Sequence, residues 1–168
     1  MTDSDRVTLL GHKVPDFSVA STSDAGEFCL AAHLAKNLAA SATQALVLYF
    51  YPKDNTPGCT TEAMQFRNLH PEISRANAIV LGVSRDSLKS HQGFKSKLGL
   101  PFDLLADTDE SLCRLFGVIR SKNMYGKQVQ GIERSTFIID GTGVVRHEWR
   151  ALKADGHAQA VLEALRTI

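Results

Sequence analysis

The chain has 168 residues, 43% of them apolar and 22% charged, so it can bury a core and is too apolar for wholesale disorder. Its formal net charge of +1 gives no reason to expect nucleic acid or an anionic membrane as a partner. No apolar run reaches the length of a bilayer span or a signal peptide, so we expect a cytoplasmic protein. Its length predicts a single domain over residues 1–168, in which residues 1–10 form a leader of uncertain order.

The N-terminal part of the chain predicts a β-hairpin at the edge of a sheet. Residues 14–20 form a short β-prone run with a proline, which an edge strand tolerates, and residues 27–30 alternate after the turn-rich residues 23–26. The alanine-rich residues 31–42 predict a short helix or a loop. The apolar run Leu46–Tyr51 then predicts a strand that is buried on both faces.

A helix is expected directly after this buried strand. Pro52 ends the strand, and Thr56 and Pro57 are typical of the N-cap and the first position of a helix. The helix should run to about Ala76, because apolar residues recur on one side of it. Those residues are Ala63, Phe66, Leu69 and Ile73.

The remaining residues alternate between strand and helix patterns. Further strands are expected at residues 78–84, 102–106, 135–140 and 144–149, the last two as a hairpin. Further helices are expected from residue 86 or 87 to 98, around 112–116 after a capping box at 107–110, and over 155–168. The polar, glycine-punctuated residues 121–131 should form a loop. This order predicts an α/β fold with a central mixed sheet flanked by helices.

The cysteines and histidines favour thiol chemistry over metal binding. Cys29, Cys59 and Cys113 form no C-x-x-C pair, so neither a zinc ribbon nor that dithiol motif is supported. An odd number of cysteines leaves at least one free thiol. The six histidines have no metal-ligand spacing, and we expect neither a metal nor another cofactor.

Cys59 falls in the first turn of the expected helix, where free backbone N–H groups and the helix dipole favour an anion such as a thiolate. Lowering the pKa of a cysteine from about 8.5 to about 6 requires roughly 3.4 kcal/mol. A helix end supplies only about 0.3–1 kcal/mol, or about 2 kcal/mol in favourable geometry. A cation from elsewhere in the chain is therefore needed, and Arg85, Arg120 and Arg134 are all candidates near strand or loop ends.

The residues around Cys59 resemble a known family. The spacing Pro52-x-x-x-Thr56-x-x-Cys59 resembles the active-site signature of the peroxiredoxins, and residues 49–62 are similar to their Q-type branch, the bacterioferritin comigratory proteins. Gly11-x-x-Val-Pro-Asp-Phe17 and Arg134-x-x-Phe-Ile-Ile-Asp140 match other parts of that branch. The resemblance covers residues 10–168 and implies a thioredoxin-like fold and a thiol-dependent peroxidase.

The resemblance also implies roles for particular residues. It selects Arg134 as the missing cation and makes Cys59 the peroxidatic cysteine, which becomes a sulfenic acid. Thr56 and Arg134 would hydrogen-bond the peroxide, the backbone N–H groups of Gly58 and Cys59 would stabilise developing negative charge, and Pro52 would shield the sulfur.

Glu62 is a separate case. A carboxylate one turn from a thiol raises the pKa of that thiol, so the expected role of Glu62 is to aim an arginine at the sulfur.

The sequence departs from the family at the resolving cysteine. Q-type relatives carry it five positions after the peroxidatic cysteine or after a phenylalanine on the next helix, and Met64 and Lys95 stand there. We expect a one-cysteine enzyme that an external thiol resets, such as thioredoxin, glutaredoxin or a small thiol. The alternative is resolution by Cys113 or Cys29.

The expected function is the reduction of hydrogen peroxide and organic hydroperoxides by a monomer or weak homodimer. An alternative is a redox sensor or relay that passes the oxidation of Cys59 to a partner protein, because both need a reactive thiol.

Overall fold

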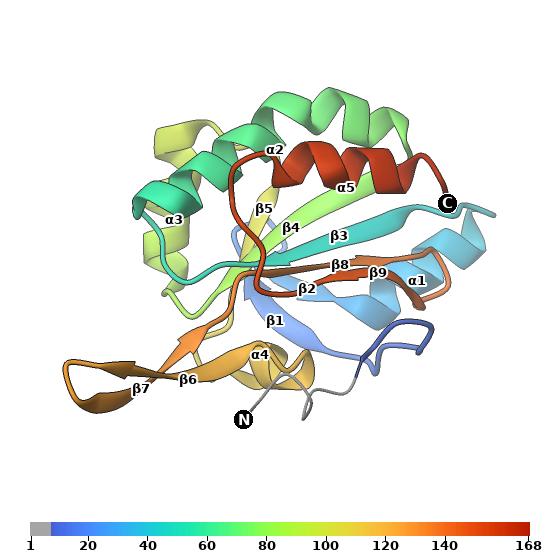
Figure 1. Cartoon of the computed structure of the whole chain (residues 1–168). Helices are drawn as coiled ribbons and strands as arrows, with labels where there is room; N and C mark the ends of the chain where they lie inside the picture. Colours follow the sequence, from blue (N-terminus) through green and yellow to red (C-terminus); the bar gives the residue numbers. More distant parts are fainter. Residues whose placement is uncertain (1–7) are drawn as a thin grey trace.

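The computed structural model describes residues 8–168, and a seven-stranded mixed sheet lies at the centre of this part of the chain (Figure 1). The strand order is β2-β1-β5-β4-β3-β8-β9. The strands are β1 (Ser18–Ser21), β2 (Glu27–Cys29), β3 (Ala45–Phe50), β4 (Ala78–Ser84), β5 (Asp103–Ala106), β8 (Ser135–Ile139) and β9 (Val145–Trp149). Strands β3, β4 and β5 are parallel, and the other pairs are antiparallel. The predicted leader lies largely outside the described residues.

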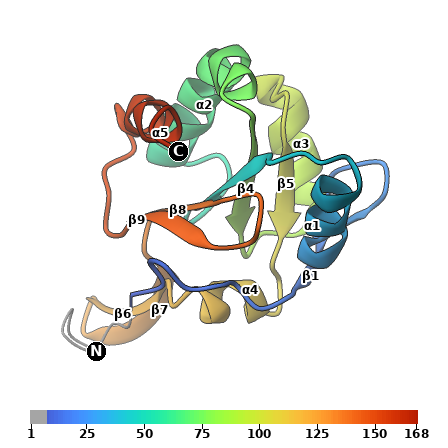
Figure 2. The ribbon, with the colours of Figure 1, turned by 90° about the vertical axis from the view of Figure 1, so that its right-hand side faces the viewer.

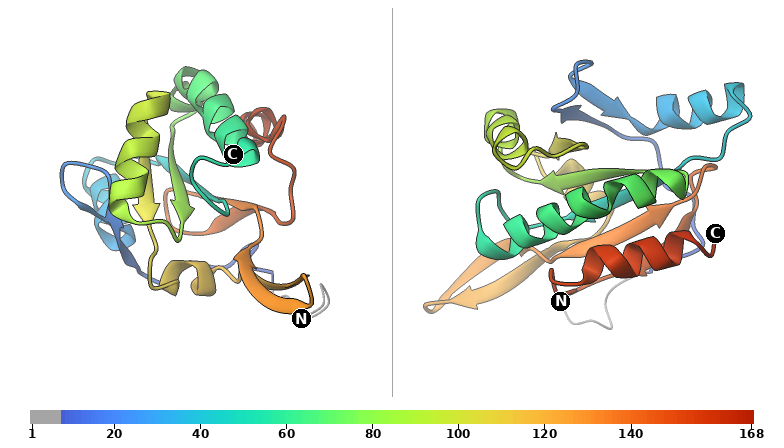
Figure 3. Two further views of the ribbon diagram at one scale, coloured as in Figure 1. Left: turned by 90° about the vertical axis from the view of Figure 1, so that its left-hand side faces the viewer. Right: turned by 90° about the horizontal axis from the view of Figure 1, so that it is seen from above.

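Helices cover both faces of this sheet (Figures 2 and 3). The helices are α1 (Leu30–Ala39), α2 (Pro57–Arg75), α3 (Leu88–Leu98), α4 (Ser111–Leu115) and α5 (His157–Leu165). Helices α2, α3 and α5 lie on one face, and α1 and α4 lie on the other. The predicted α/β fold is therefore confirmed. None of the helices in residues 8–168 is long and apolar enough to cross a membrane.

Strand β3 separates two hydrophobic cores. Alternate side chains of a strand point to opposite faces of the sheet. Val47 and Tyr49 accordingly pack in the core under α2 and α5, while Leu48 and Phe50 pack in the core on the side of α1 and α4. All six residues of β3 are buried, as the continuous apolar run predicted.

The N-terminal hairpin is confirmed, since β1 and β2 pair antiparallel. The edge position belongs to β2, however, because β1 also pairs with β5. Pro15 precedes β1, so it needs no edge position in the ladder.

The prediction of a loop at residues 121–131 is wrong. Strands β6 (Ile119–Met124) and β7 (Lys127–Ile132) form a separate antiparallel hairpin that projects from the body (Figure 1). Both residues of its turn, Tyr125 and Gly126, have positive φ angles, as a tight two-residue hairpin turn requires. Most of its side chains are exposed on both faces, so the apolar alternation that marks a half-buried strand is missing.

The predicted capping box before α4 is also wrong in detail. The carboxylate of Asp107 accepts the backbone N–H groups of Leu112 and Cys113 at 3.0 and 2.7 Å. Glu110, at the N-cap, has φ 64° and pairs with Arg85 and Arg114 instead of capping the helix. Asp107 and Asp109 supply the cap, because Asp109 accepts the N–H of Ser111 at 3.0 Å.

Candidate active site

The candidate site lies where β3 ends and α2 begins. Parallel strands β3, β4 and β5 end at the same edge of the sheet, and the loop of residues 51–56 leads from β3 into α2 there (Figure 1). Pro57 is the first residue of α2, and Thr56 has the extended backbone of an N-cap residue. The predicted start of the helix is confirmed.

Cys59 is the third residue of α2 and is 2% exposed. The first hydrogen bond of the helix runs from the N–H of Thr60 to the carbonyl of Thr56 at 2.9 Å. The N–H groups of Gly58 and Cys59 therefore precede the hydrogen-bonded ladder of α2, where free donors are available to an anion. The sulfur lies in the core under α2 and α5, not in open solvent.

The structure brings Arg134 to the sulfur. Strand β8 pairs antiparallel with β3, with Ser135 opposite Phe50, so Arg134 stands beside the end of β3. Its Nη2 lies 3.4 Å from Sγ of Cys59. A Cβ atom at position 58 would lie 3.2 Å from this Nη2, so Gly58 leaves room for the guanidinium.

The same guanidinium also binds Glu62. Nη1 of Arg134 donates to Oε1 of Glu62 at 2.6 Å. Burial raises the pKa of Glu62 to about 7, although Arg134 acts in the opposite direction. Burial would lower the pKa of Arg134, but Glu62 and Cys59 outweigh it and raise that pKa. Glu62 thus contacts the guanidinium that faces Cys59, and its raised pKa lies near neutral pH.

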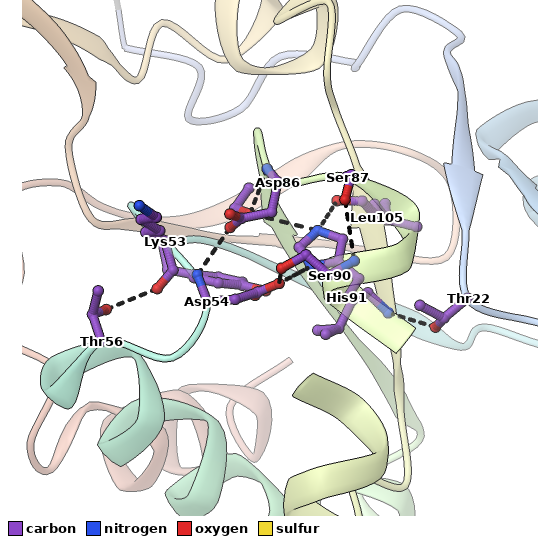
Figure 4. Close-up of polar contacts among 12 residues, drawn as sticks. Thr22, Lys53, Asp54, Thr56, Asp86, Ser87, Ser90, His91 and Leu105 are labelled. Atoms are coloured by element: carbon purple, nitrogen blue, oxygen red, sulfur yellow. Dashed lines mark hydrogen bonds and ion pairs between the residues drawn. The ribbon is translucent and has the colours of Figure 1, made fainter. Parts of the chain in front are cut away.

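Thr56 and Pro52 both belong to the loop before the helix. The hydroxyl of Thr56 donates to the carbonyl of Lys53 at 2.7 Å, so its oxygen is left to accept a hydrogen bond (Figure 4). The family resemblance implies that this side chain hydrogen-bonds the peroxide. Pro52 is half-buried at the start of the loop.

The other two cysteines lie away from Cys59. Cys113 is fully buried in the core on the opposite face of the sheet, and burial, together with Asp107, raises the pKa of its thiol. Cys29 is at the end of β2, four strand positions from β3, which corresponds to roughly 19 Å at the usual strand spacing.

The structure also shows the surroundings of the two positions at which Q-type relatives carry a resolving cysteine. Met64 is on the exposed side of α2, and Lys95 on α3 pairs with Asp103 at 2.7 Å.

One group near the site was missed at the sequence level. Asp54, in the loop between β3 and α2, is buried and bonded to His91 of α3 at 2.8 Å (Figure 4). The only sequence signal is that an acidic residue follows each of β3, β4 and β5, at positions 54, 86 and 107. Neither spacing nor periodicity connects Asp54 with a histidine on another helix.

Comparison with known families and structures agrees with this geometry. The family model described as AhpC/TSA family matches residues 10–148. Peroxiredoxin Bcp of Xanthomonas campestris is 59% identical over 129 residues, which cover 77% of this chain and 81% of that protein. Putative peroxiredoxin bcp of Helicobacter pylori is 45% identical over 156 residues, covering 93% and 97% of the two chains.

Solved structures are similar as well. Xanthomonas campestris peroxiredoxin Q aligns with a TM-score of 0.80 at 51% identity and covers 90% of each chain. A structure with the same measures is that of the X. campestris bacterioferritin comigratory protein, which is described with alkyl peroxide reduction activity.

Proposed function

The chain belongs to the AhpC/TSA family and is a thiol peroxidase of the peroxiredoxin Q type, and on this premise we propose that Cys59 is its peroxidatic cysteine. The proposed substrates are hydrogen peroxide and small organic hydroperoxides. The observation that carries this assignment is the contact of 3.4 Å between Nη2 of Arg134 and Sγ of Cys59. This contact supplies the cation that a thiolate at Cys59 needs in addition to the helix N-terminus.

Two features of the site favour a thiolate at Cys59. The helix N-terminus favours the anion by about 0.3–1 kcal/mol, or about 2 kcal/mol in partly buried geometry. A hydrogen bond from a charged donor adds about 1.5–3 kcal/mol.

In the oxidation step the thiolate of Cys59 attacks the distal peroxide oxygen. An S–O bond forms and the O–O bond breaks, so the sulfur is oxidised to a sulfenic acid and the proximal oxygen leaves as an alkoxide or hydroxide. That oxygen takes a proton and leaves as an alcohol or water. Arg134 and the N–H groups of Gly58 and Cys59 would stabilise its negative charge, while the oxygen of Thr56 would accept the peroxide O–H. Pro52 would shield the sulfenate.

We propose that an external thiol resets the enzyme. A reductant thiol would form a mixed disulfide with Cys59 and release water, and a second thiol would then release Cys59 as the thiol. The separation of Cys113 and Cys29 from Cys59 supports this one-cysteine cycle. Thioredoxin, glutaredoxin or a small thiol would serve as reductant, no cofactor is needed, and a cytoplasmic monomer or weak homodimer remains our expectation.

Substitution of each cysteine tests the assignment. Peroxide consumption should be measured for the wild type, Cys59→Ser, Cys113→Ala and Cys29→Ser with a panel of thioredoxin, glutaredoxin and glutathione. Cys59→Ser should abolish consumption above background, while the other two variants should retain most of it. Full activity of Cys59→Ser would overturn the proposal. Oxidation without turnover by any reductant would favour the redox relay.

A further inference from the structure

His91 and Asp54 form a buried pair beside the peroxidatic loop. His91 of α3 is fully buried, and its Nδ1 lies 2.8 Å from Oδ2 of Asp54. Its other nitrogen, Nε2, lies 2.9 Å from the backbone carbonyl of Leu105, in β5. Figure 4 shows these side chains meeting between the loop, α3 and β5.

Both ring nitrogens of His91 face oxygen atoms at hydrogen-bond distance. A backbone carbonyl can only accept a hydrogen bond, so Nε2 must donate to Leu105. Asp54 also accepts the hydroxyls of Tyr51 and Ser90 at 2.7 and 2.8 Å, and these contacts favour its ionised form. Burial raises the pKa of Asp54, but the hydrogen bonds from His91, Tyr51 and Ser90 outweigh it and lower that pKa. Nδ1 of His91 thus lies 2.8 Å from a carboxylate that three side chains hold in place.

The same residues could be considered as ligands of a metal ion, because single ligand atoms of Asp54, Asp86 and His91 lie within 4.8 Å of one another. The two nitrogens of His91 are both engaged, however, by Asp54 and Leu105. Oδ2 of Asp86 accepts the N–H of Asp54 at 2.9 Å and the hydroxyl of Ser84 at 2.5 Å. A metal would have to break these bonds, so the cluster is better explained as a buried hydrogen-bonded network.

Asp54 binds the loop of residues 51–56, which leads to Cys59, to two neighbouring segments. It stands between Pro52 and Thr56, and its side chain is bonded to α3 while its backbone N–H is bonded to Asp86 after β4. The hydroxyl of Thr56 in turn holds the carbonyl of Lys53. The start of α2 is thus tied to two other segments through one residue (Figure 4).

We propose that the Asp54–His91 pair is a latch that sets how readily the Cys59 turn leaves its buried position. Cys59 is 2% exposed, and a reductant thiol on a protein is much larger than a peroxide. The turn must therefore move outward before such a thiol can attack the oxidised sulfur. A closed latch keeps Cys59 against Arg134 for reaction with peroxide, and an open latch lets the reductant in. His91 and Asp54 are then positioning residues. This inference rests on the proposed function of Cys59.

The test compares His91→Gln, Asp54→Asn and the double variant with the wild type. Three rates should be measured: oxidation of Cys59 by hydrogen peroxide, reduction of its sulfenic acid by thioredoxin, and labelling of reduced Cys59 by a bulky maleimide, located by peptide mapping. Urea unfolding reports overall stability. His33→Gln is the matched control, because His33 is a half-buried histidine of α1, on the other face of the sheet.

Each single variant should slow oxidation by about tenfold and speed maleimide labelling and reduction by a similar factor, which corresponds to the loss of one charged hydrogen bond. In the double variant the changes in these rates should be smaller than in either single variant, because no buried charge is left without a partner. His33→Gln should behave as the wild type. Should the single variants fail to fold, Ser90→Ala removes one bond to Asp54 and should shift the rates in the same directions by about twofold to threefold.

Rates that fall in parallel, or that all stay unchanged, would overturn the latch. Parallel loss would mean that His91 only supports the fold. A wild type whose Cys59 is not oxidised by peroxide would instead contradict the proposed function, and the labelling rates would still decide whether the latch exists.

Discussion

At the scale of single residues, the site depends on one guanidinium that makes two contacts. Arg134 reaches the sulfur of Cys59 with one nitrogen and the carboxylate of Glu62 with another. The planar, forked arrangement of its N–H groups allows both contacts at once, which the point charge of a lysine cannot reproduce. Gly58 contributes by leaving space for this group.

Arg134→Lys should therefore lower the rate constant for oxidation of Cys59 by about tenfold to a hundredfold, the equivalent of one charged hydrogen bond. Stopped-flow measurement with hydrogen peroxide would give this rate constant. Arg146→Lys is a suitable control, because Arg146 is an exposed residue of β9 that bonds Asp140. Equal rate constants for Arg134→Lys and the wild type would contradict the role of the fork.

Glu62→Gln should change how stability depends on pH. Burial raises the pKa of Glu62 from its ordinary value of 4.5 to about 7, so the folded protein holds this proton more tightly than the unfolded chain. The free energy of unfolding should then decrease as pH rises from about 4.5 to about 7, by up to about 3 kcal/mol. The glutamine variant lacks this contribution.

Urea unfolding of both proteins at pH 5 and pH 8 tests this expectation. The free energy of unfolding of the variant minus that of the wild type should be larger at pH 8 than at pH 5. A difference that is constant with pH, or that moves in the other direction, would show that Glu62 is already ionised at pH 5.

At the scale of elements, packing around β3 sets the position of the reactive turn. Gly82 of β4 lies opposite Tyr49 of β3 in the parallel pair. A Cβ atom at position 82 would lie 2.8 Å from the ring of Tyr49 and from Cδ2 of Leu104. The glycine therefore allows a large aromatic ring to pack directly against the sheet.

Gly82→Ala should lower the free energy of unfolding by about 1–3 kcal/mol, as overpacking a buried site does. Gly93→Ala is the matched control, because Gly93 is an exposed residue of α3 with nothing within 4 Å of its added Cβ. That control should stabilise the protein by about 0.5–1 kcal/mol through helix propensity. Chemical denaturation of both variants measures the two values, and a Gly82→Ala variant as stable as the wild type would contradict the packing argument.

The elements also show what the sequence can and cannot predict. Buried strands and the start of α2 were predictable, because apolar runs, Thr56 and Pro57 are local signals. The choice of Arg134 over Arg85 and Arg120 came from family resemblance, since it depends on the pairing of β8 with β3. The β6–β7 hairpin escaped prediction because its exposed strands lack apolar alternation. The Asp54–His91 pair joins segments that no periodicity connects.

At the scale of the whole molecule, the sheet divides the thiols between two cores. Cys59 lies in the core with α2 and α5, and Cys113 lies in the core on the side of α1 and α4. A disulfide between them would require the chain to pass around or through the sheet. The same division supports the proposal that Cys113 takes no part in the reaction. One domain for the whole chain stays our expectation.

Intact-mass spectrometry after one equivalent of hydrogen peroxide, with dimedone present to trap sulfenic acid, tests the one-cysteine assignment most directly. We predict a single dimedone adduct on Cys59, with Cys29 and Cys113 remaining as free thiols. With glutathione in place of dimedone, the product should be a mixed disulfide between glutathione and Cys59. An intramolecular disulfide that joins Cys59 to Cys113 or Cys29, or an adduct on a cysteine other than Cys59, would contradict the account.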